Sequence, residues 1–108
     1  MRILFDQGTP VPLRRALTGH QIATTFERGW QTLQNGDLLV TAESAGYEAF
    51  VTTDRNLQYQ QNLTGRQLAV LVLPTTDWRQ IQRHVDIVAK GVEALTAGAY
   101  VELSFPTE

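Results

Sequence analysis

The sequence predicts a three-layer α/β fold on a mainly parallel sheet of about five strands. Short apolar segments alternate along the chain with segments whose apolar residues recur at helical spacing. Strands separated by helices imply right-handed crossovers, which place helices on both faces of the sheet. With 108 residues and no repeat, low-complexity segment or linker, the chain is expected to form a single domain, 1–108.

Five short segments have the composition of strands. They are expected at 2–5, 21–25, 49–53, 68–73 and 100–105. The segment 68–73 is apolar throughout, as expected for a strand covered on both faces. The segment 100–105 instead alternates apolar and polar residues, which suits an edge strand. The predicted sheet is therefore buried at its centre and half-exposed at this edge.

The intervening segments carry helix start and stop signals. These are prolines allowed in a first turn, Asn or Asp at the start, and Gly at the end. On this basis helices are expected over roughly 9–19, 35–46, 56–62 and 77–95. The last segment, with Asp77 and Gln80 as N-cap and N3 partner, has apolar residues at helical spacing and reads as one long helix.

Composition excludes several function classes. The chain has no cysteine, so disulfides, thiolate zinc sites and thiol nucleophiles are ruled out. No signal-peptide region opens the sequence, and the longest apolar run, 68–73, is too short to span a bilayer. We therefore expect a cytoplasmic protein with no membrane association. The net charge of −2 argues against bulk attraction to nucleic acid, although eight arginines against one lysine favour local phosphate contacts.

Two strands each run directly into an aspartate. Asp6 follows the first strand and Asp54 follows the third. In a parallel sheet the carboxyl ends of the strands share one edge, which is where ligands bind. Two carboxylates there repel each other and favour a divalent cation or a shared proton. Either aspartate alone would also serve as a turn or capping residue.

Three further acidic residues are candidates for the same site. Asp37 opens the helix after the second strand, where it either caps that helix or points its carboxylate at the metal. Glu27 follows the second strand on the correct side and could complete the cluster. Glu43, well around the helix from Asp37, fits a solvated helix face better. The predicted ligands are therefore Asp6, Asp37, Asp54 and Glu27.

The residues around Asp54 could contact substrate. Thr52 and Thr53 offer hydroxyls as ligands or supporting hydrogen-bond partners. Arg55, followed by Asn56, could bind a phosphate or neutralise the carboxylates. Thr53, Arg55 and Asn56 are the predicted substrate-binding residues.

The order of these parts resembles the compact bacterial PIN-like domains. The resemblance covers roughly residues 2–75 and is carried by ILFDQGTP, a Gly-Trp loop, NGDLL at a helix start, and the strand ending TTDRNL. Asp6 matches the first-strand aspartate, Asp37 the acidic residue at the mid-chain helix, and Asp54 the aspartate that closes the Thr-x-Asp strand. The fourth carboxylate of the family has no match, and Glu27 and Glu43 are the available substitutes.

The resemblance implies a PIN-like sheet and an acidic pocket for Mg²⁺ or Mn²⁺. It further implies metal-dependent hydrolysis of RNA, often by the toxin half of a toxin–antitoxin pair. The expected partners are therefore an RNA substrate and an antitoxin protein, with a homodimer also open at the edge strand or the exposed helices.

Two alternatives to a nuclease stay open. The first is a PIN-like module that binds protein without catalysis, which the absent fourth acid favours. The second is a phosphoreceiver-like domain, with acidic residues after strands one and three and Thr75 or Thr76 after strand four. Against it, the first strand ends in a single Asp6 rather than an acidic pair. The sole lysine, Lys90, lies in the last helix rather than after a late strand.

Overall fold

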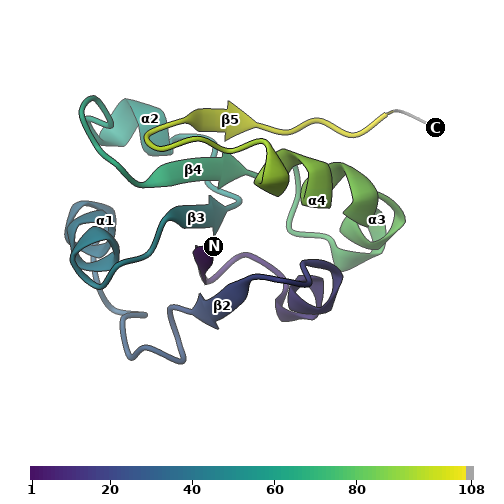
Figure 1. The fold of residues 1–108 in the computed structure, drawn as a ribbon, viewed down its shortest axis with the longest axis horizontal. Coiled ribbons are helices and arrows are strands. Elements are labelled where there is room, and N and C mark those ends of the chain that lie inside the picture. The colour runs from purple at the N-terminus through teal and green to yellow at the C-terminus, as the bar shows by residue number, and fades with distance from the viewer. Residues whose placement is uncertain (107–108) are drawn as a thin grey trace.

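The computed structural model describes residues 1–106 and confirms the predicted α/β class, with five strands in one parallel sheet (Figure 1). The strand order is β2-β1-β3-β4-β5. Their bounds are β1 Arg2–Phe5, β2 Gln21–Thr24, β3 Ala49–Thr52, β4 Ala69–Val72 and β5 Tyr100–Glu102. Each agrees with the sequence-based expectation to within one residue, except that β5 stops three residues before the predicted end.

The first strand lies inside the sheet and pairs on both sides. Leu4 is in register with Ala23 of β2 on one side and with Phe50 of β3 on the other. The chain therefore adds β2 to one side of β1 and then continues with β3 on the opposite side. This reversal is a topological switch point, and ligands of open α/β sheets bind beside the carboxyl ends of strands at such a point.

The helices differ more from expectation than the strands do. They are η1 Val11–Ala16, α1 Asn35–Ser44, α2 Leu57–Gln60, α3 Trp78–Arg83 and α4 Val85–Glu93. The first is a 3₁₀ helix. The second, α1, begins at Asn35 as predicted. Helix α2 is a single turn because the polar segment 56–62 offers Leu57 as its one buried side chain in that turn.

The predicted long helix after Asp77 is interrupted at His84. The backbone of His84 leaves the helical region, with φ −129° and ψ 29°, so that α3 and α4 are separate. Ile81 before the break and Val88 after it are both fully buried in the same core. Because the apolar spacing continues across the break, the sequence pattern could not reveal it.

Two hydrophobic cores lie on opposite faces of the sheet and make the three layers. On one face, alternate residues of the central strands pack against η1, α3 and α4. The strand residues in this core include Ile3, Phe5, Val51, Leu71 and Val101. On the other face, the strand residues between them pack against α1 and α2. These include Leu4, Phe50, Val70 and Val72. Burial on both faces explains why the central strands read as continuous apolar runs.

The last strand lies at the edge of the sheet, as its alternating pattern predicts. Val101, Leu103 and Phe105 are partly buried against the first of the two cores, although Leu103 and Phe105 lie beyond the paired residues of β5. Within residues 1–106, no helix is long and apolar enough to cross a membrane.

Candidate functional site

The two aspartates that follow β1 and β3 meet at the switch point through the side chain of Thr52. The backbone N–H of Asp6 donates to the Val51 carbonyl oxygen at 2.9 Å, so the edge of the sheet is paired up to the aspartate. The Thr52 hydroxyl donates to Oδ2 of Asp6 at 2.7 Å. The same Oγ1 accepts the backbone N–H of Asp54 at 3.1 Å. The structure therefore brings the predicted pair, Asp6 and Asp54, to one place.

Thr52 positions both aspartates because its hydroxyl is buried. The side chain has no exposed surface, so its single proton and its acceptor lone pair must find partners within the protein. The proton goes to the carboxylate of Asp6, and the hydroxyl oxygen accepts the backbone N–H of Asp54. Both carboxylates are only half-buried. Each carboxylate oxygen has two lone-pair sites, so hydrogen bonding leaves room for a cation.

Two local backbone bonds fix the orientation of the carboxylates. Oδ1 of Asp6 accepts the N–H of Gln7 at 2.9 Å, and Oδ1 of Asp54 accepts the N–H of Asn56 at 2.9 Å. These are turns in which an aspartate bonds the backbone just after it. The turn and site interpretations of these residues are therefore compatible.

The start of α1 contacts Asp54. Nδ2 of Asn35 donates to Oδ2 of Asp54 at 3.4 Å and to Oε1 of Gln60 at 3.3 Å. The amino end of a helix carries partial positive charge, which favours a carboxylate nearby. Asp37 lies in the first turn of α1 and is exposed. It does not cap the helix, because the N-cap residue is Gln34.

Glu27 is held by an arginine. Its carboxylate receives both terminal nitrogens of Arg14, at 2.6 and 3.2 Å, and the backbone N–H of Thr24 at 2.9 Å. The Arg14 hydrogen bonds, followed by that from Thr24, hold the pKa of Glu27 below its usual 4.5. Glu43 is likewise paired, with Arg66 at 2.7 Å.

No group of three Asp, Glu or His side chains in residues 1–106 is arranged to hold a metal ion. The structure thus joins Asp6 and Asp54 but does not bring Glu27, Glu43 or Asp37 into one group with them.

The ion pair between Glu27 and Arg14 predicts how the stability of the fold depends on pH. A lowered pKa means that the pair stabilises the fold above the usual pKa of 4.5, and this contribution is lost as the pH falls through the lowered value. Replacing Arg14→Gln is expected to raise the Glu27 pKa toward its ordinary value, with the hydrogen bond from Thr24 still lowering it. Carboxyl chemical shifts followed over pH would measure this, and an unchanged Glu27 titration in the variant would contradict the pairing.

The predicted substrate-binding residues lie at the same edge. The side chain of Arg55 donates through Nη2 to the carbonyl oxygen of Pro74 at 2.9 Å, so it reaches toward the loop after β4. No ion pair joins Arg55 to Asp54 among the described residues, in contrast to the neutralising role that the sequence left open. Asn56 contacts Asp54 through its backbone.

Gly8 allows the loop after β1 to approach Thr53 closely. A Cβ at Gly8 would lie 2.5 Å from Oγ1 of Thr53 and 3.7 Å from a methyl carbon of Thr76. The loops after β1, β3 and β4 therefore meet beside the aspartate pair. The sequence gives no sign of this close approach, because Gly8, Thr53 and Thr76 come from chain segments far apart in sequence.

Replacing Gly8→Ala is expected to lower the free energy of unfolding by about 1 kcal/mol, since Thr53 must leave its preferred rotamer. Chemical denaturation would measure this difference. The same substitution in a Thr53→Ala background, where the hydroxyl is gone, should cost clearly less. Equal costs in the two backgrounds would show that the contact with Thr53 is not the cause.

Tyr100 lies within electrostatic reach of the site. Its hydroxyl donates to Oε2 of Glu102 at 3.1 Å. Burial first, then the hydrogen bond and charge of Glu102, with smaller effects of Tyr59 and Asp54, raise its pKa from 10.0 to about 12. The folded state therefore favours the neutral phenol.

The raised pKa of Tyr100 predicts a loss of stability at high pH. Its contribution is complete below the ordinary value of 10.0 and is lost as the pH rises toward about 12. An ultraviolet titration should show one of the three tyrosines ionising last. Glu102→Gln should bring that step to lower pH. Three tyrosines titrating together near 10 would contradict the assignment.

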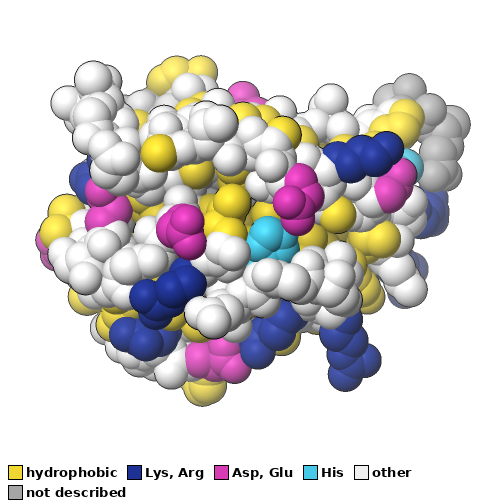
Figure 2. Space-filling model, viewed as in Figure 1, with side chains coloured by type: hydrophobic (Ala, Val, Ile, Leu, Met, Phe, Trp, Pro, Cys, Tyr) yellow, Lys and Arg dark blue, Asp and Glu magenta, His cyan; other side chains and the backbone are white. Residues whose placement is uncertain are grey.

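Basic and acidic side chains are interspersed on the face that Figure 2 shows, and they do not gather there into one broad basic patch. On this face, any contact with nucleic acid would have to be local. Comparison of the chain with protein-family models, with curated proteins and with solved structures gave no match.

Proposed function

We propose that this protein is a divalent-metal-dependent ribonuclease of the PIN-like type. The observation that carries the proposal is the pairing of Asp6 and Asp54 through the buried Thr52 hydroxyl at the switch point. Carboxylates that follow neighbouring strands at a ligand-binding edge of the sheet are oxygen ligands of the kind that a hard cation prefers.

The oxygens at this edge suit Mg²⁺ or Mn²⁺. Magnesium keeps several waters and is commonly held by one or two carboxylates together with substrate phosphates, so Asp6 and Asp54 suffice as a protein core for the site. Asp37 remains the proposed third ligand on the position of its helix, which begins beside Asp54 at Asn35, although within residues 1–106 its carboxylate forms no group with the pair. Glu27 is left out of the ligand set because Arg14 engages both of its carboxylate oxygens.

The surrounding residues would position the reacting groups. When bound, the cation supplies charge neutralisation at the phosphate and makes water a better nucleophile near neutral pH. Thr52 keeps Asp6 oriented, and Asn35 does the same for Asp54. Arg55, with Thr53 and Asn56, would bind RNA phosphates and fix the strand.

We propose that this activity belongs to a cytoplasmic toxin that has a protein antitoxin and acts as a monomer or homodimer.

A non-catalytic PIN-like module is the second candidate. The observation that favours it is that no third acidic residue of the described chain joins the pair. A phosphoreceiver shares the strand order 2-1-3-4-5. It is less favoured because no lysine follows β5 and Asp6 stands alone after β1.

Incubating the protein with labelled single-stranded RNA in Mn²⁺ tests the proposal. We expect cleavage that needs the metal and stops when EDTA is added. Labelling of Asp54 by acetyl phosphate would support the phosphoreceiver instead. Intact RNA in Mn²⁺, with no such labelling, would leave the binding module as the better account.

A further inference from the structure

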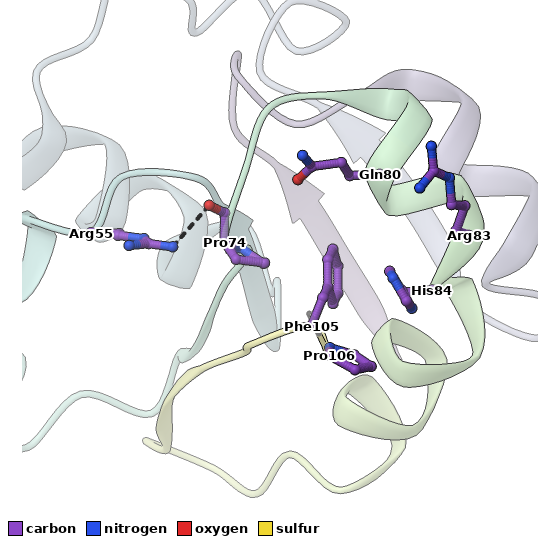
Figure 3. A pocket seen from close by; sticks show the side chains of 7 residues that line it. All are labelled: Arg55, Pro74, Gln80, Arg83, His84, Phe105 and Pro106. Carbon is purple, nitrogen blue, oxygen red and sulfur yellow. Dashed lines mark hydrogen bonds between the residues drawn. The ribbon is translucent and has the colours of Figure 1, made fainter. Parts of the chain in front are cut away.

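A concave site lies on the same edge of the sheet, next to the aspartate pair through Arg55. It encloses about 450 Å³, within the roughly 300–1,000 Å³ typical of small-ligand pockets. Its walls come from the segments that follow β3, β4 and β5, and from α3 with the joint after it (Figure 3). The lining residues are Arg55, Pro74, Gln80, Arg83, His84, Phe105 and Pro106.

The lining is locally basic although the chain is acidic overall. Arg55 and Arg83 contribute two guanidinium groups, and none of the lining residues within 1–106 is a carboxylate. The hydrogen bond of Arg55 goes to a neutral carbonyl oxygen, that of Pro74, so this bond leaves its positive charge uncompensated. A planar guanidinium matches phosphate in a two-pronged geometry.

The remaining walls suit a flat ring. Phe105 lies between Pro74 and His84 in Figure 3. The ring of Phe105 lies against the ring of His84, with centroids 4.8 Å apart and planes inclined by 31°. Aromatic surfaces of this kind stack nucleic-acid bases without sequence preference. The exposed carboxamide of Gln80 offers both a donor and an acceptor to base edges.

Arg55 joins this pocket to the aspartate pair. It directly follows Asp54 and reaches to the loop after β4, whose Thr76 lies beside Gly8. An RNA strand with one phosphate at the aspartate pair would therefore run past Arg55 into the pocket.

We infer that the pocket is a nucleotide subsite, which holds a neighbouring nucleotide of the RNA strand whose phosphate lies at Asp6 and Asp54. The inference rests on the proposed function and adds the subsite to it. Arg55 binds the phosphate, and Phe105 stacks the base. A ligand with both an anionic group and a flat ring matches the lining better than an acidic peptide, which supplies only the anion.

Fluorescence anisotropy of a labelled single-stranded RNA oligonucleotide, measured in EDTA, tests the subsite without any metal. Arg55→Gln is expected to weaken binding about tenfold and to reduce the salt dependence by about one phosphate contact. Phe105→Leu should weaken binding about fivefold or more, as loss of a stacked base does. Arg79→Gln is the matched control, since Arg79 is exposed on α3 but does not line the pocket. RNA binding by this variant should stay within about twofold of that by the unmodified protein.

Other variants and competitors separate the alternatives. Arg55→Lys keeps the charge and should lose less affinity for RNA than Arg55→Gln. This difference would show that the loss in Arg55→Gln comes from the missing charge and not from a folding defect. Equal losses in Arg55→Gln and Arg79→Gln would overturn the subsite, because binding would then be diffuse electrostatics. Competition by a mononucleotide as strong as that by the oligonucleotide would overturn it in favour of a free nucleotide. Equal competition by an acidic peptide would overturn the base-stacking role.

Failure of this inference is distinct from failure of the nuclease. Arg55→Gln should leave Mn²⁺ binding at Asp6 and Asp54 unchanged. Weakened RNA binding in EDTA together with intact metal binding is the expected combination. RNA binding insensitive to Arg55 and Phe105, with metal binding intact, would remove the subsite and the phosphate role of Arg55 and leave the metal centre standing.

Discussion

Replacing Asp54→Asn or Asp6→Asn is expected to lower RNA cleavage in Mn²⁺ by at least ~100-fold. The effect should exceed the roughly 10–100-fold that follows loss of an outer-shell partner, because the substituted group would be a direct ligand. The fold should survive, since an asparagine keeps an acceptor oxygen for the Thr52 hydroxyl and for the N–H of Asn56. Initial rates on a labelled RNA would measure the loss.

Asp86→Asn is the matched control for these variants. Asp86 is exposed in the first turn of α4 and does not line the pocket, and its loss changes the net charge by the same amount. Its cleavage rate should match the unmodified protein. A rate that falls equally in all three variants would show that net charge, rather than the aspartate pair, controls RNA cleavage.

Removing the hydroxyl that joins the two aspartates is expected to have a double effect. Thr52→Val keeps the shape of a fully buried side chain but leaves the backbone N–H of Asp54 without its acceptor. The free energy of unfolding should fall by about 1–3 kcal/mol, the cost of an unsatisfied buried group. Affinity for Mn²⁺ should fall roughly 10–100-fold, because Asp6 loses the donor that orients it.

Thr52→Ser separates the hydroxyl from the methyl group. It restores the donor and the acceptor, so metal affinity should return close to that of the unmodified protein, while a modest loss of stability from the missing methyl remains. Chemical denaturation and Mn²⁺ titration of both variants would measure these effects. Equal metal affinities in Thr52→Val and Thr52→Ser would contradict the positioning role.

Much of the sheet could be predicted from sequence because its residues report burial directly. The segment around Val70 is apolar at every position since both of its faces are covered, whereas the edge segment alternates at Val101 and Leu103. The helices were less predictable. A break such as that at His84 leaves the apolar spacing intact, so helical periodicity carries no trace of it.

The aspartate pair could also be anticipated, because the position of a residue just after a strand fixes where it lies in a parallel sheet. The positions of Asp6 and Asp54 at the sheet edge follow from that rule alone. The residues that contact them could not be predicted in this way. Asn35 reaches Asp54 from a separate helix, and Gly8 approaches Thr53 from another loop. Such contacts depend on how loops fold over the edge, which no local pattern records.

The same limit applies to Glu27. Its place after the second strand suggested a ligand, but Arg14 comes within 2.6 Å of it from the preceding helical turn. An arginine thirteen residues away in sequence gives no periodic signal, yet it decides the role of the carboxylate.

Calorimetric titration of Mn²⁺ into the protein, into Asp6→Asn and into Asp54→Asn tests whether the aspartate pair is a metal centre. We expect a binding isotherm for the unmodified protein that is lost or weakened at least ~100-fold in each variant and preserved in Asp86→Asn. Absence of binding to the unmodified protein, or binding that persists without Asp6, would show that the pair joined by Thr52 is a structural feature of the sheet edge and not a metal centre.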